Sequence, residues 1–404
     1  MNIWIINHYA LTPDQAGGTR HYDIARQLIA KGHKVTIIAS SFHYALHKEM
    51  KTYPSDQEYL IEEIEGINFI WIKTTPYLTN GIKRVLNMLE FTRQLKVLKT
   101  LPLSKPDIIV GSSVHLFAVY GAYKLSKFFK VPFVMEVRDI WPQTLIDMGI
   151  PKFHPFIILL GFMERFLYQK ADSIITLLPK ASEHIESFGI PASKIFWVSN
   201  GVDTNPFINP QPSHLLNAEK FNLLYVGSIG MANNLELLID AAKELIELND
   251  LAITIVGTGP LKETLQKQAQ DLKNITFLPP ISKTDVPALL SEADLLYVAL
   301  KDLPLYRFGM SMNKVFDYMA SAKPILFASN VASNPVAISN SGIIIDPDDK
   351  DAIVNAVRRV YNATKETQKT MGDNGKAYVQ EHFEISVIAT QFETALIKAQ
   401  ENHA

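Results

Sequence analysis

The sequence predicts an α/β protein with two Rossmann-like domains, each built on a doubly wound parallel sheet. Three observations lead to this prediction. The 404 residues are enough for about two domains. Short continuous apolar runs alternate with stretches of helical periodicity, which is typical of parallel strands covered by helices on both faces. The alternation stops near residue 205 and then starts again. We therefore expect a ligand cleft between the carboxyl edges of two sheets.

The first domain is expected over residues 1–204. Helical periodicity is clearest over 19–30 and 115–128. The apolar runs that predict its strands are 3–6, 35–39, 69–72, 108–110, 133–137, 174–177 and 195–198.

The second domain is expected over residues 205–382, after a linker with Pro206, Pro210 and Pro212. Its predicted strands are 223–226, 253–256, 275–278, 295–298, 325–328 and 343–345, and its predicted helices are 235–248, 261–272, 313–321 and 352–361. The last segment, 383–404, reads as a helix with no strand after it, so we expect it to cross back to the first domain.

Composition excludes several classes of function. The net charge of −2 gives no global bias toward nucleic acid. The absence of cysteine excludes disulfides, thiolate catalysis and thiolate metal sites. The longest apolar run, 156–162, is far shorter than the roughly 20 residues that span a bilayer. The chain begins directly with a strand pattern instead of a signal peptide. We therefore expect a cytoplasmic protein.

The most informative motif is Asn-Lys-Val-Phe-Asp-Tyr-Met-Ala at 313–320, which reads as a helix that follows a loop. Free N–H groups at a helix N-terminus bind phosphate. The carboxylate of Asp317, one turn further in, is able to accept hydrogen bonds from sugar hydroxyls. This arrangement suits a nucleotide diphosphate, and the alternative is a surface helix docked on a sheet.

Small residues follow the first strand of each domain. Gly17 and Gly18 precede the first helix, and Gly227 and Ser228 follow the strand that ends at 226. Such residues let backbone N–H groups approach phosphate closely. A second glycine loop, 257–259, follows the next predicted strand in the same way. Tight strand-to-helix turns are the alternative interpretation.

Charged side chains also end one strand of the first domain. The string at 136–142 contains Glu136, Arg138 and Asp139 beside a tryptophan, and burial of such groups is costly unless they are paired or functional. His115 follows the preceding strand in the same way. We interpret both as site residues. The alternatives are a structural arginine–carboxylate cluster and a histidine at a helix start.

Two further patterns concern surfaces. Residues 81–101 predict an amphipathic helix that could lie on anionic lipid or simply face solvent; its basic residues are Lys83, Arg84, Arg93, Lys96 and Lys99, and its apolar ones include Ile82, Val85, Leu86 and Leu89. The apolar cluster at 153–168 could add to this contact. The acidic run at 346–349 predicts a helix cap in preference to a metal site.

With these motifs together, the chain resembles the retaining family-four glycosyltransferases with the two-domain GT-B fold, over nearly its full length. It looks most similar to bacterial O-antigen, capsule and colanic-acid transferases, including the N-acetyl-L-fucosamine transferase subgroup. The resemblance rests on the Gly17-Gly18 loop and on the strings at 136–142, 198–203 and 313–326.

The chain departs from the family pattern at three places. The subgroup often has Pro-Ser-Lys before the helix, where this chain has Ser-Met-Asn-Lys at 311–314. Gly309 stands at the first position of the Glu-x7-Glu pair, and Asp317 stands at the second. Relatives use an Arg and a Lys after the strand that ends here at 226, where this chain has only uncharged residues at 231–233. We expect Lys314 and Arg307 to supply the missing positive charge.

The resemblance implies a role for each matching residue. Asp317 would bind the donor ribose, and Ile281 would cradle the base. His115 and Arg138 would contact the donor sugar, and Asp139 would bind the acceptor or shape the cleft. The remaining matches would line the diphosphate and sugar: Gly17, Gly18, Ser311, Met312, Asn313 and Lys314. Gly227 and Ser228 are expected at the donor phosphate from their place after a strand.

The resemblance therefore implies a retaining, metal-independent transferase without a cofactor. It would move a sugar, expected to be a 2-acetamido deoxy-sugar, from a UDP-sugar to a polyprenyl-diphosphate-linked acceptor. The expected location is the cytoplasm, with peripheral contact at the inner face of the cytoplasmic membrane. Two alternatives remain at this stage: a non-catalytic nucleotide-sugar-binding protein and an enzyme like the UDP-GlcNAc 2-epimerases.

Overall fold

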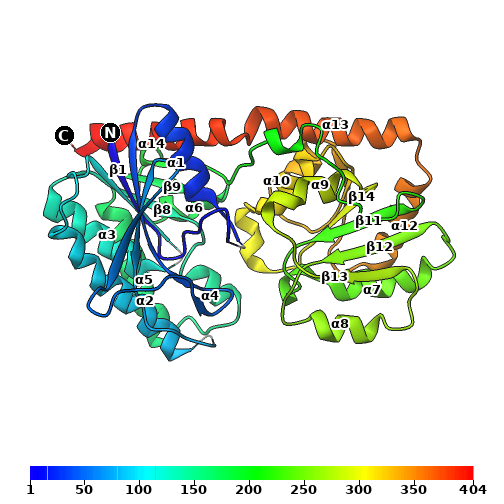
Figure 1. The fold of residues 1–404 in the computed structure, drawn as a ribbon, viewed down its shortest axis with the longest axis horizontal. Helices are drawn as coiled ribbons and strands as arrows, with labels where there is room; N and C mark the ends of the chain where they lie inside the picture. Colours follow the sequence, from blue (N-terminus) through cyan, green and yellow to red (C-terminus); the bar gives the residue numbers. More distant parts are fainter. Residues whose placement is uncertain (16, 80, 114, 404) are drawn as a thin grey trace. The chain divides into compact units, whose positions relative to one another are not determined.

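The computed structural model describes residues 1–15, 17–79, 81–113 and 115–403. The chain divides into two compact units. Unit 1 comprises Met1–Asn200 together with Ile385–Ala404, and unit 2 comprises Gly201–Glu384. Figure 1 labels many of the elements of both units.

Unit 1 is built on an eight-stranded sheet in the order β10-β9-β8-β7-β1-β2-β6-β5. All neighbours in it run parallel except β5 and β6. The strands are β1 (Asn2–Ile6), β2 (Lys34–Ser40), β5 (Tyr59–Ile64), β6 (Ile67–Ile72), β7 (Ile108–Ser112), β8 (Phe133–Val137), β9 (Ser173–Thr176) and β10 (Ile195–Trp197). A separate two-stranded ribbon pairs β3 (Phe42–His43) with β4 (Lys48–Glu49).

The helices of unit 1 include the C-terminal segment, α14, which packs against α1 and β9. In Figure 1 the red α14 runs beside the blue α1. The helices are α1 (Arg20–Ala30), α2 (Ile82–Gln94), η1 (Leu95–Lys99), α3 (Leu116–Phe129), α4 (Gln143–Asp147), α5 (Pro155–Lys170), α6 (Ala181–Glu186), η2 (Ala192–Lys194) and α14 (Ile385–His403).

Unit 2 is built on a six-stranded, all-parallel sheet in the order β13-β12-β11-β14-β15-β16. The strands are β11 (Phe221–Val226), β12 (Leu251–Val256), β13 (Ile275–Leu278), β14 (Leu295–Ala299), β15 (Ile325–Ala328) and β16 (Gly342–Ile345). The helices are η3 (Asn205–Phe207), η4 (Met231–Asn233), α7 (Leu235–Glu244), α8 (Lys262–Gln268), η5 (Lys283–Asp285), α9 (Val286–Ser291), η6 (Pro304–Phe308), α10 (Asn313–Ala320), α11 (Pro335–Ile338), α12 (Lys350–Tyr361) and α13 (Lys365–His382).

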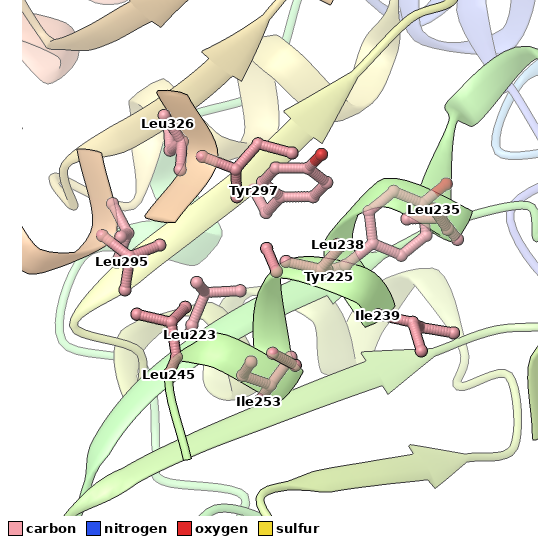
Figure 2. Packing of buried hydrophobic residues seen from close by; sticks show 14 of the residues in the cluster. Leu223, Tyr225, Leu235, Leu238, Ile239, Leu245, Ile253, Leu295, Tyr297 and Leu326 are labelled. Atoms are coloured by element: carbon pink, nitrogen blue, oxygen red, sulfur yellow. The ribbon is translucent and has the colours of Figure 1, made fainter. Parts of the chain in front are cut away.

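One core of unit 2 lies between its sheet and the helices α7 and α12. Figure 2 labels Leu235 and Leu238 of α7 together with Leu223 and Tyr225 of β11 in this core, and these side chains are buried. Continuous apolar strands suit this environment because both faces of a parallel sheet are covered.

Each strand predicted from the sequence is present, with bounds that differ by no more than two residues. The parallel α/β architecture is therefore confirmed. The predicted helices 235–248 and 261–272 are shorter in the structure, where α7 ends at Glu244 and α8 ends at Gln268. The strand β5 and the long helix α13 were not predicted.

Candidate functional site

Lys314 lies in the first turn of α10, and its ammonium group reaches back to the end of β11. Nζ donates to Tyr225 Oη at 2.9 Å and to Asn233 Oδ1 at 3.0 Å, and it lies 4.5 Å from the centre of the Tyr225 ring. An ammonium group has three N–H donors, so one remains for another partner. Within the described ranges, no carboxylate forms an ion pair with Lys314.

The charge of Lys314 is poorly stabilised in this position. Burial lowers the pKa of its ammonium group from 10.5 to about 7. An anion beside the ammonium group would raise this pKa again, because an opposite charge favours the protonated form. The position is therefore suited to hold a negatively charged ligand.

The loop after β11 is shaped around this ammonium group. Gly227 has a φ of 155°, and a Cβ atom there would lie 2.9 Å from Lys314 Nζ. Tyr225 Oη and Asn233 Nδ2 both donate to the carbonyl oxygen of Ser228, at 2.6 and 2.9 Å. The structure thus brings the predicted residues Gly227, Ser228 and Lys314 together.

Tyr225 and Asn233 complete this group, and sequence reasoning missed both. Asn233 stands among the uncharged residues where relatives are expected to carry a cation, which was the available signal. Tyr225 reads from the sequence only as an apolar strand residue, since its hydroxyl contacts depend on tertiary structure.

The second glycine loop has a different role from the one expected. A Cβ atom on Gly257 would lie 1.9 Å from Gly227 O, and one on Gly259 would lie 2.3 Å from Ile229 O. These glycines therefore allow the loops after β11 and β12 to pack backbone against backbone. The close packing of these two loops is enough to explain both glycines without a bound phosphate.

Asp317 lies on α10 one turn beyond Lys314 and is partly exposed. The next residue, Tyr318, fixes the helix to the sheet. Its hydroxyl accepts from Val226 N at 2.7 Å and donates to Val226 O at 3.2 Å. Ser311, Met312 and Asn313 form the entry to α10, where no side chain caps the helix N-terminus. First-turn N–H groups of α10 thus lie next to Lys314.

Two predicted donor residues of unit 2 have other surroundings. Arg307 lies on η6, where its guanidinium group donates to Pro304 O and lies 4.3 Å from the ring centre of Phe308. Ile281 lines a hollow together with Pro206, Pro210, Pro212 and Pro287, among others. Neither contributes to the contacts of Lys314 described above.

In unit 1, Glu136 is the centre of a buried polar network. Oε1 accepts from Arg20 Nε at 2.9 Å, and Oε2 lies 2.6 Å from His21 Nε2 and also accepts from Ser112 Oγ. Burial alone would raise the pKa of Glu136, but His21 and Arg20 hold it well below its ordinary value. Arg20 also donates to the carbonyl oxygens of residues 198 and 199. Glu136 therefore holds α1, β7 and the end of unit 1 together.

His115 is fully buried. It forms the N-cap of α3, and its Nδ1 accepts from Ala118 N at 3.2 Å. Its Nε2 lies 2.7 Å from His8 Nδ1. The structure thus places His115 between a helix end and a second histidine.

The other predicted residues of unit 1 lie at loops. The amide of Arg138 donates to Ser113 Oγ at 3.0 Å, and Asp139 is exposed. Gly17 has a φ of 147°, and a Cβ atom there would lie 2.4 Å from Leu11 Cδ1. Gly18, beside it, is partly exposed. Ala16 and Val114, which belong to the same two motifs, lie outside the described residues.

The acidic run 346–349 ends in a helix cap, as the sequence predicted. Asp349 Oδ1 accepts from Ala352 N at 2.8 Å at the start of α12. In the part of the chain that the structure describes, no group of three or more His, Cys, Asp or Glu side chains is placed to hold a metal ion.

Comparison with known domain families matches both parts of the chain. Residues 17–206 match the family described as Glycosyltransferase Family 4, and residues 220–363 match the one described as Glycosyl transferases group 1. Both matched segments are glycosyltransferase domains. The chain is therefore a glycosyltransferase, an enzyme that transfers a sugar.

Three similar proteins give the comparison its detail. The putative colanic acid biosynthesis glycosyl transferase WcaI of Escherichia coli K12 is 26% identical over 292 residues, which are 67% of this chain and 70% of that protein. Sucrose-phosphate synthase from Thermosynechococcus elongatus has a TM-score of 0.74 at 18% identity, covering 97% of each chain. Anabaena Alr3699/HepE in complex with UDP-glucose has a TM-score of 0.68 at 14% identity, covering 98% of this chain and 99% of that one. This likeness shows that the glycosyltransferase has the GT-B fold, with two Rossmann-like domains.

Proposed function

We propose that this glycosyltransferase moves a sugar, a 2-acetamido deoxy-sugar by resemblance, from a UDP-sugar to a lipid-linked glycan in the synthesis of a bacterial surface polysaccharide. The observation that supports it most is the ammonium group of Lys314, which lies beside the Gly227 loop and forms no ion pair with a carboxylate within the described ranges. The name of WcaI and the UDP-glucose bound in HepE support the polysaccharide and the nucleotide.

The diphosphate of the donor would bind at Lys314 and the first turn of α10. A phosphate oxygen would accept a hydrogen bond from the remaining N–H of Lys314, and first-turn N–H groups would donate to further phosphate oxygens. Asp317, one turn on, would accept hydrogen bonds from the ribose hydroxyls. In this proposal Arg307 and Ile281 belong to the outer part of the donor site, toward the sugar-phosphate and the base.

Transfer requires stabilisation of the charge that grows on the leaving diphosphate. Lys314 and the N-terminus of α10 would provide it from fixed positions, so the reaction would need neither a metal ion nor a cofactor. The departing phosphate would take the proton of the acceptor hydroxyl on the same face of the sugar, which retains the anomeric configuration.

The residues of unit 1 would act on the sugar and the acceptor. Arg138 is proposed to contact the donor sugar, and the exposed Asp139 to bind the acceptor. His115 is fully buried, so we assign it a positioning role at the N-terminus of α3. Gly17 and Gly18 allow close approach of the loop that precedes α1.

A lipid-linked acceptor also suggests that the protein makes peripheral contact with an anionic membrane through unit 1. The buried face of α2 consists of Asn87, Met88, Phe91 and Gln94, so its apolar residues Ile82 and Leu86 point outward and are 80% and 53% exposed. The helix α5, which packs against α3 as α2 does, exposes Phe162 as well. Exposed apolar side chains next to lysines and arginines suit the surface of an anionic bilayer. No helix in the described ranges has the length and hydropathy to cross a bilayer.

The function is tested by supplying labelled UDP-, GDP- and dTDP-sugars with bacterial polyprenyl-diphosphate-linked acceptors in the presence of EDTA. We expect label from a UDP-sugar in the lipid product, and an anomeric configuration equal to that of the donor by NMR. Epimer formation without acceptor would indicate the 2-epimerase alternative. Donor binding without hydrolysis or transfer would indicate a non-catalytic binding protein, and inversion of the configuration would refute the proposed chemistry.

A further inference from the structure

A fixed pair of histidines lies where β1 and β7 end in unit 1. His8 follows β1, and its Nδ1 lies 2.7 Å from Nε2 of His115. Both side chains are almost completely buried. The His8 ring stacks on Tyr9 at 4.4 Å and on Phe91 at 4.3 Å between ring centres, with interplanar angles of 12° and 4°. This stacking fixes the plane of the His8 ring.

The hydrogen bonds determine which nitrogen carries each proton. His115 Nδ1 accepts from Ala118 N, so the proton of His115 lies on Nε2. That Nε2–H then donates to His8 Nδ1, and the proton of His8 must lie on its own Nε2. Burial lowers the pKa of both rings, to about 3 for His115 and well below 6.5 for His8, so both rings are neutral as this assignment requires.

The histidine pair therefore ends in an N–H donor that no described residue accepts. His8 Nε2 is buried and has no hydrogen-bond partner among the described residues. The two ring nitrogens lie on opposite edges of the imidazole, so Nε2 points away from His115, in the plane between the Tyr9 and Phe91 rings. Leaving such a donor unpaired costs folding free energy, which a ligand oxygen would recover.

The charge near this donor indicates the kind of oxygen. The guanidinium carbon of Arg84 lies 6.0 Å from the centre of the Tyr9 ring, and its charge contributes to the lowered pKa of both histidines. A neutral N–H donor beside a cation favours an anionic oxygen over a neutral one. Tyr44, in the turn between β3 and β4, packs against Tyr9 at 5.2 Å.

We propose that His8 is a substrate-binding residue whose Nε2–H donates to a phosphate oxygen of the acceptor, next to Arg84, and that His115 positions it. Access to Nε2 requires the aromatic side chains around it to move, and Tyr44 in the turn between β3 and β4 packs against one of them. This inference rests on the proposed function for the identity of the acceptor, but the binding itself can be measured without transfer.

The test uses the full chain with farnesyl diphosphate as a soluble prenyl diphosphate and with inorganic pyrophosphate. Binding is measured by calorimetry, and the histidine nitrogens are followed by ¹⁵N NMR. His8→Phe keeps the ring stacking but removes the donor, and we expect it to weaken binding of farnesyl diphosphate at least about tenfold. His33→Phe is the control, because His33 lies beside Met1 and Glu393, where β2 begins. We expect it to bind as the wild type does.

In the wild type, NMR should show His8 protonated at Nε2 and a shift of that signal when farnesyl diphosphate binds. Equal affinity of His8→Phe and wild type, or no shift of His8, would overturn the proposal; the NMR result on wild type holds even if the variant folds poorly. Pyrophosphate that binds as tightly as farnesyl diphosphate would identify free phosphate as the ligand instead of the lipid-linked acceptor. A parallel titration with UDP separates the two claims, since its failure would contradict the proposed function and leave the His8 result standing.

Discussion

At the scale of single residues, Lys314 shows that the contacts of a side chain in the folded protein decide what that side chain can bind. Its place in the 313–320 motif is visible in the sequence, and so is the lack of a cation at 231–233. The two partners that orient it lie 89 and 81 residues earlier in the chain: Tyr225 in β11 and Asn233 in η4. Sequence reasoning could name the residue, but not the contacts that leave one N–H donor for a ligand.

The first prediction concerns the affinity for the donor. Lys314→Met should weaken binding of UDP-glucose by roughly 10- to 100-fold, because a charge-assisted hydrogen bond contributes about 1.5–3 kcal/mol. The fold should keep its stability, since a charge that forms no ion pair is removed. Calorimetric titration and denaturant unfolding measure the two quantities. Lys369→Met, at an exposed residue of α13 paired with Asp373, is the control; a similar loss there would argue against a specific role.

The second prediction concerns pH. The pKa of free Lys314 is about 7, and a bound diphosphate should raise it. Above pH 7 the complex then holds more protons than the free protein, so binding takes up a proton and affinity falls as pH rises. UDP-glucose suits the measurement because its phosphates keep their charge in this range. Calorimetry at pH 8 in buffers of different ionisation enthalpy reports the proton directly, and equal enthalpies in all buffers would contradict the assignment.

The histidine pair shows the limit of the sequence at this scale. His115 was singled out because it follows a predicted strand, and the family resemblance then implied a role for it. His8 follows β1 in the same way but was not singled out, since nothing in the local sequence distinguishes it from a core histidine. Only the hydrogen bond between the rings, across more than 100 residues, reveals that the pair ends in an unsatisfied donor.

At the scale of elements, the buried strands were predictable and the polar elements were not. Strands such as β12 and β15 are continuous apolar runs, because helices cover both faces of their sheet. The strand β5 lies at the edge of its sheet, antiparallel to β6, and from Leu60 onward its residues alternate between partly buried and exposed. Helix α13 is rich in polar residues and contains two glycines. Its sequence therefore has no clear apolar stripe from which a helix could be predicted.

The glycines of α13 are explained by packing. A Cβ atom on Gly372 would lie 2.0 Å from Ala322 O, so the helix backbone approaches the turn after α10 closely. We predict that Gly372→Ala destabilises the protein by about 1–3 kcal/mol despite the better helix propensity of alanine. Gly161→Ala in α5, where a Cβ atom meets nothing within 4 Å, should instead leave stability unchanged or raise it by up to about 1 kcal/mol. Urea unfolding of both variants checks this, and equal effects would refute the packing argument.

At the scale of the whole molecule, the two-domain α/β architecture followed from the restart of the strand–helix pattern. That restart reflects two cores, each with its own parallel sheet. Of the predicted donor residues of unit 2, Gly227 and Ser228 lie beside the contacts of Lys314, whereas Arg307 and Ile281 have other surroundings. The sequence could not show that Glu136 serves the internal structure of unit 1, because a charged string at a strand end reads the same whether it is paired or free.

The fourth prediction concerns the molecular surface. Vesicles of phosphatidylcholine and phosphatidylglycerol should bind the wild type, and Ile82→Ser with Leu86→Ser should lower the partition coefficient at least about tenfold, since each buried apolar side chain contributes about 1.5–3 kcal/mol. Ile338→Ser, at an exposed residue of α11 in unit 2, serves as the control and should have no effect. Flotation of the vesicles at low and high salt measures the apolar and the electrostatic contributions to binding. Binding that depends on neither the α2 residues nor salt would exclude this surface.

The central claim, that the glycosyltransferase uses a UDP-sugar held by α10, is tested most directly by thermal unfolding with UDP, GDP, dTDP and CMP. A ligand at about 100 times its dissociation constant adds roughly 2.7 kcal/mol to the free energy of unfolding. We expect UDP to raise the melting temperature of the wild type and to have little effect on Asp317→Ala. No shift with any nucleotide, or a UDP shift that Asp317→Ala leaves intact, would contradict the account.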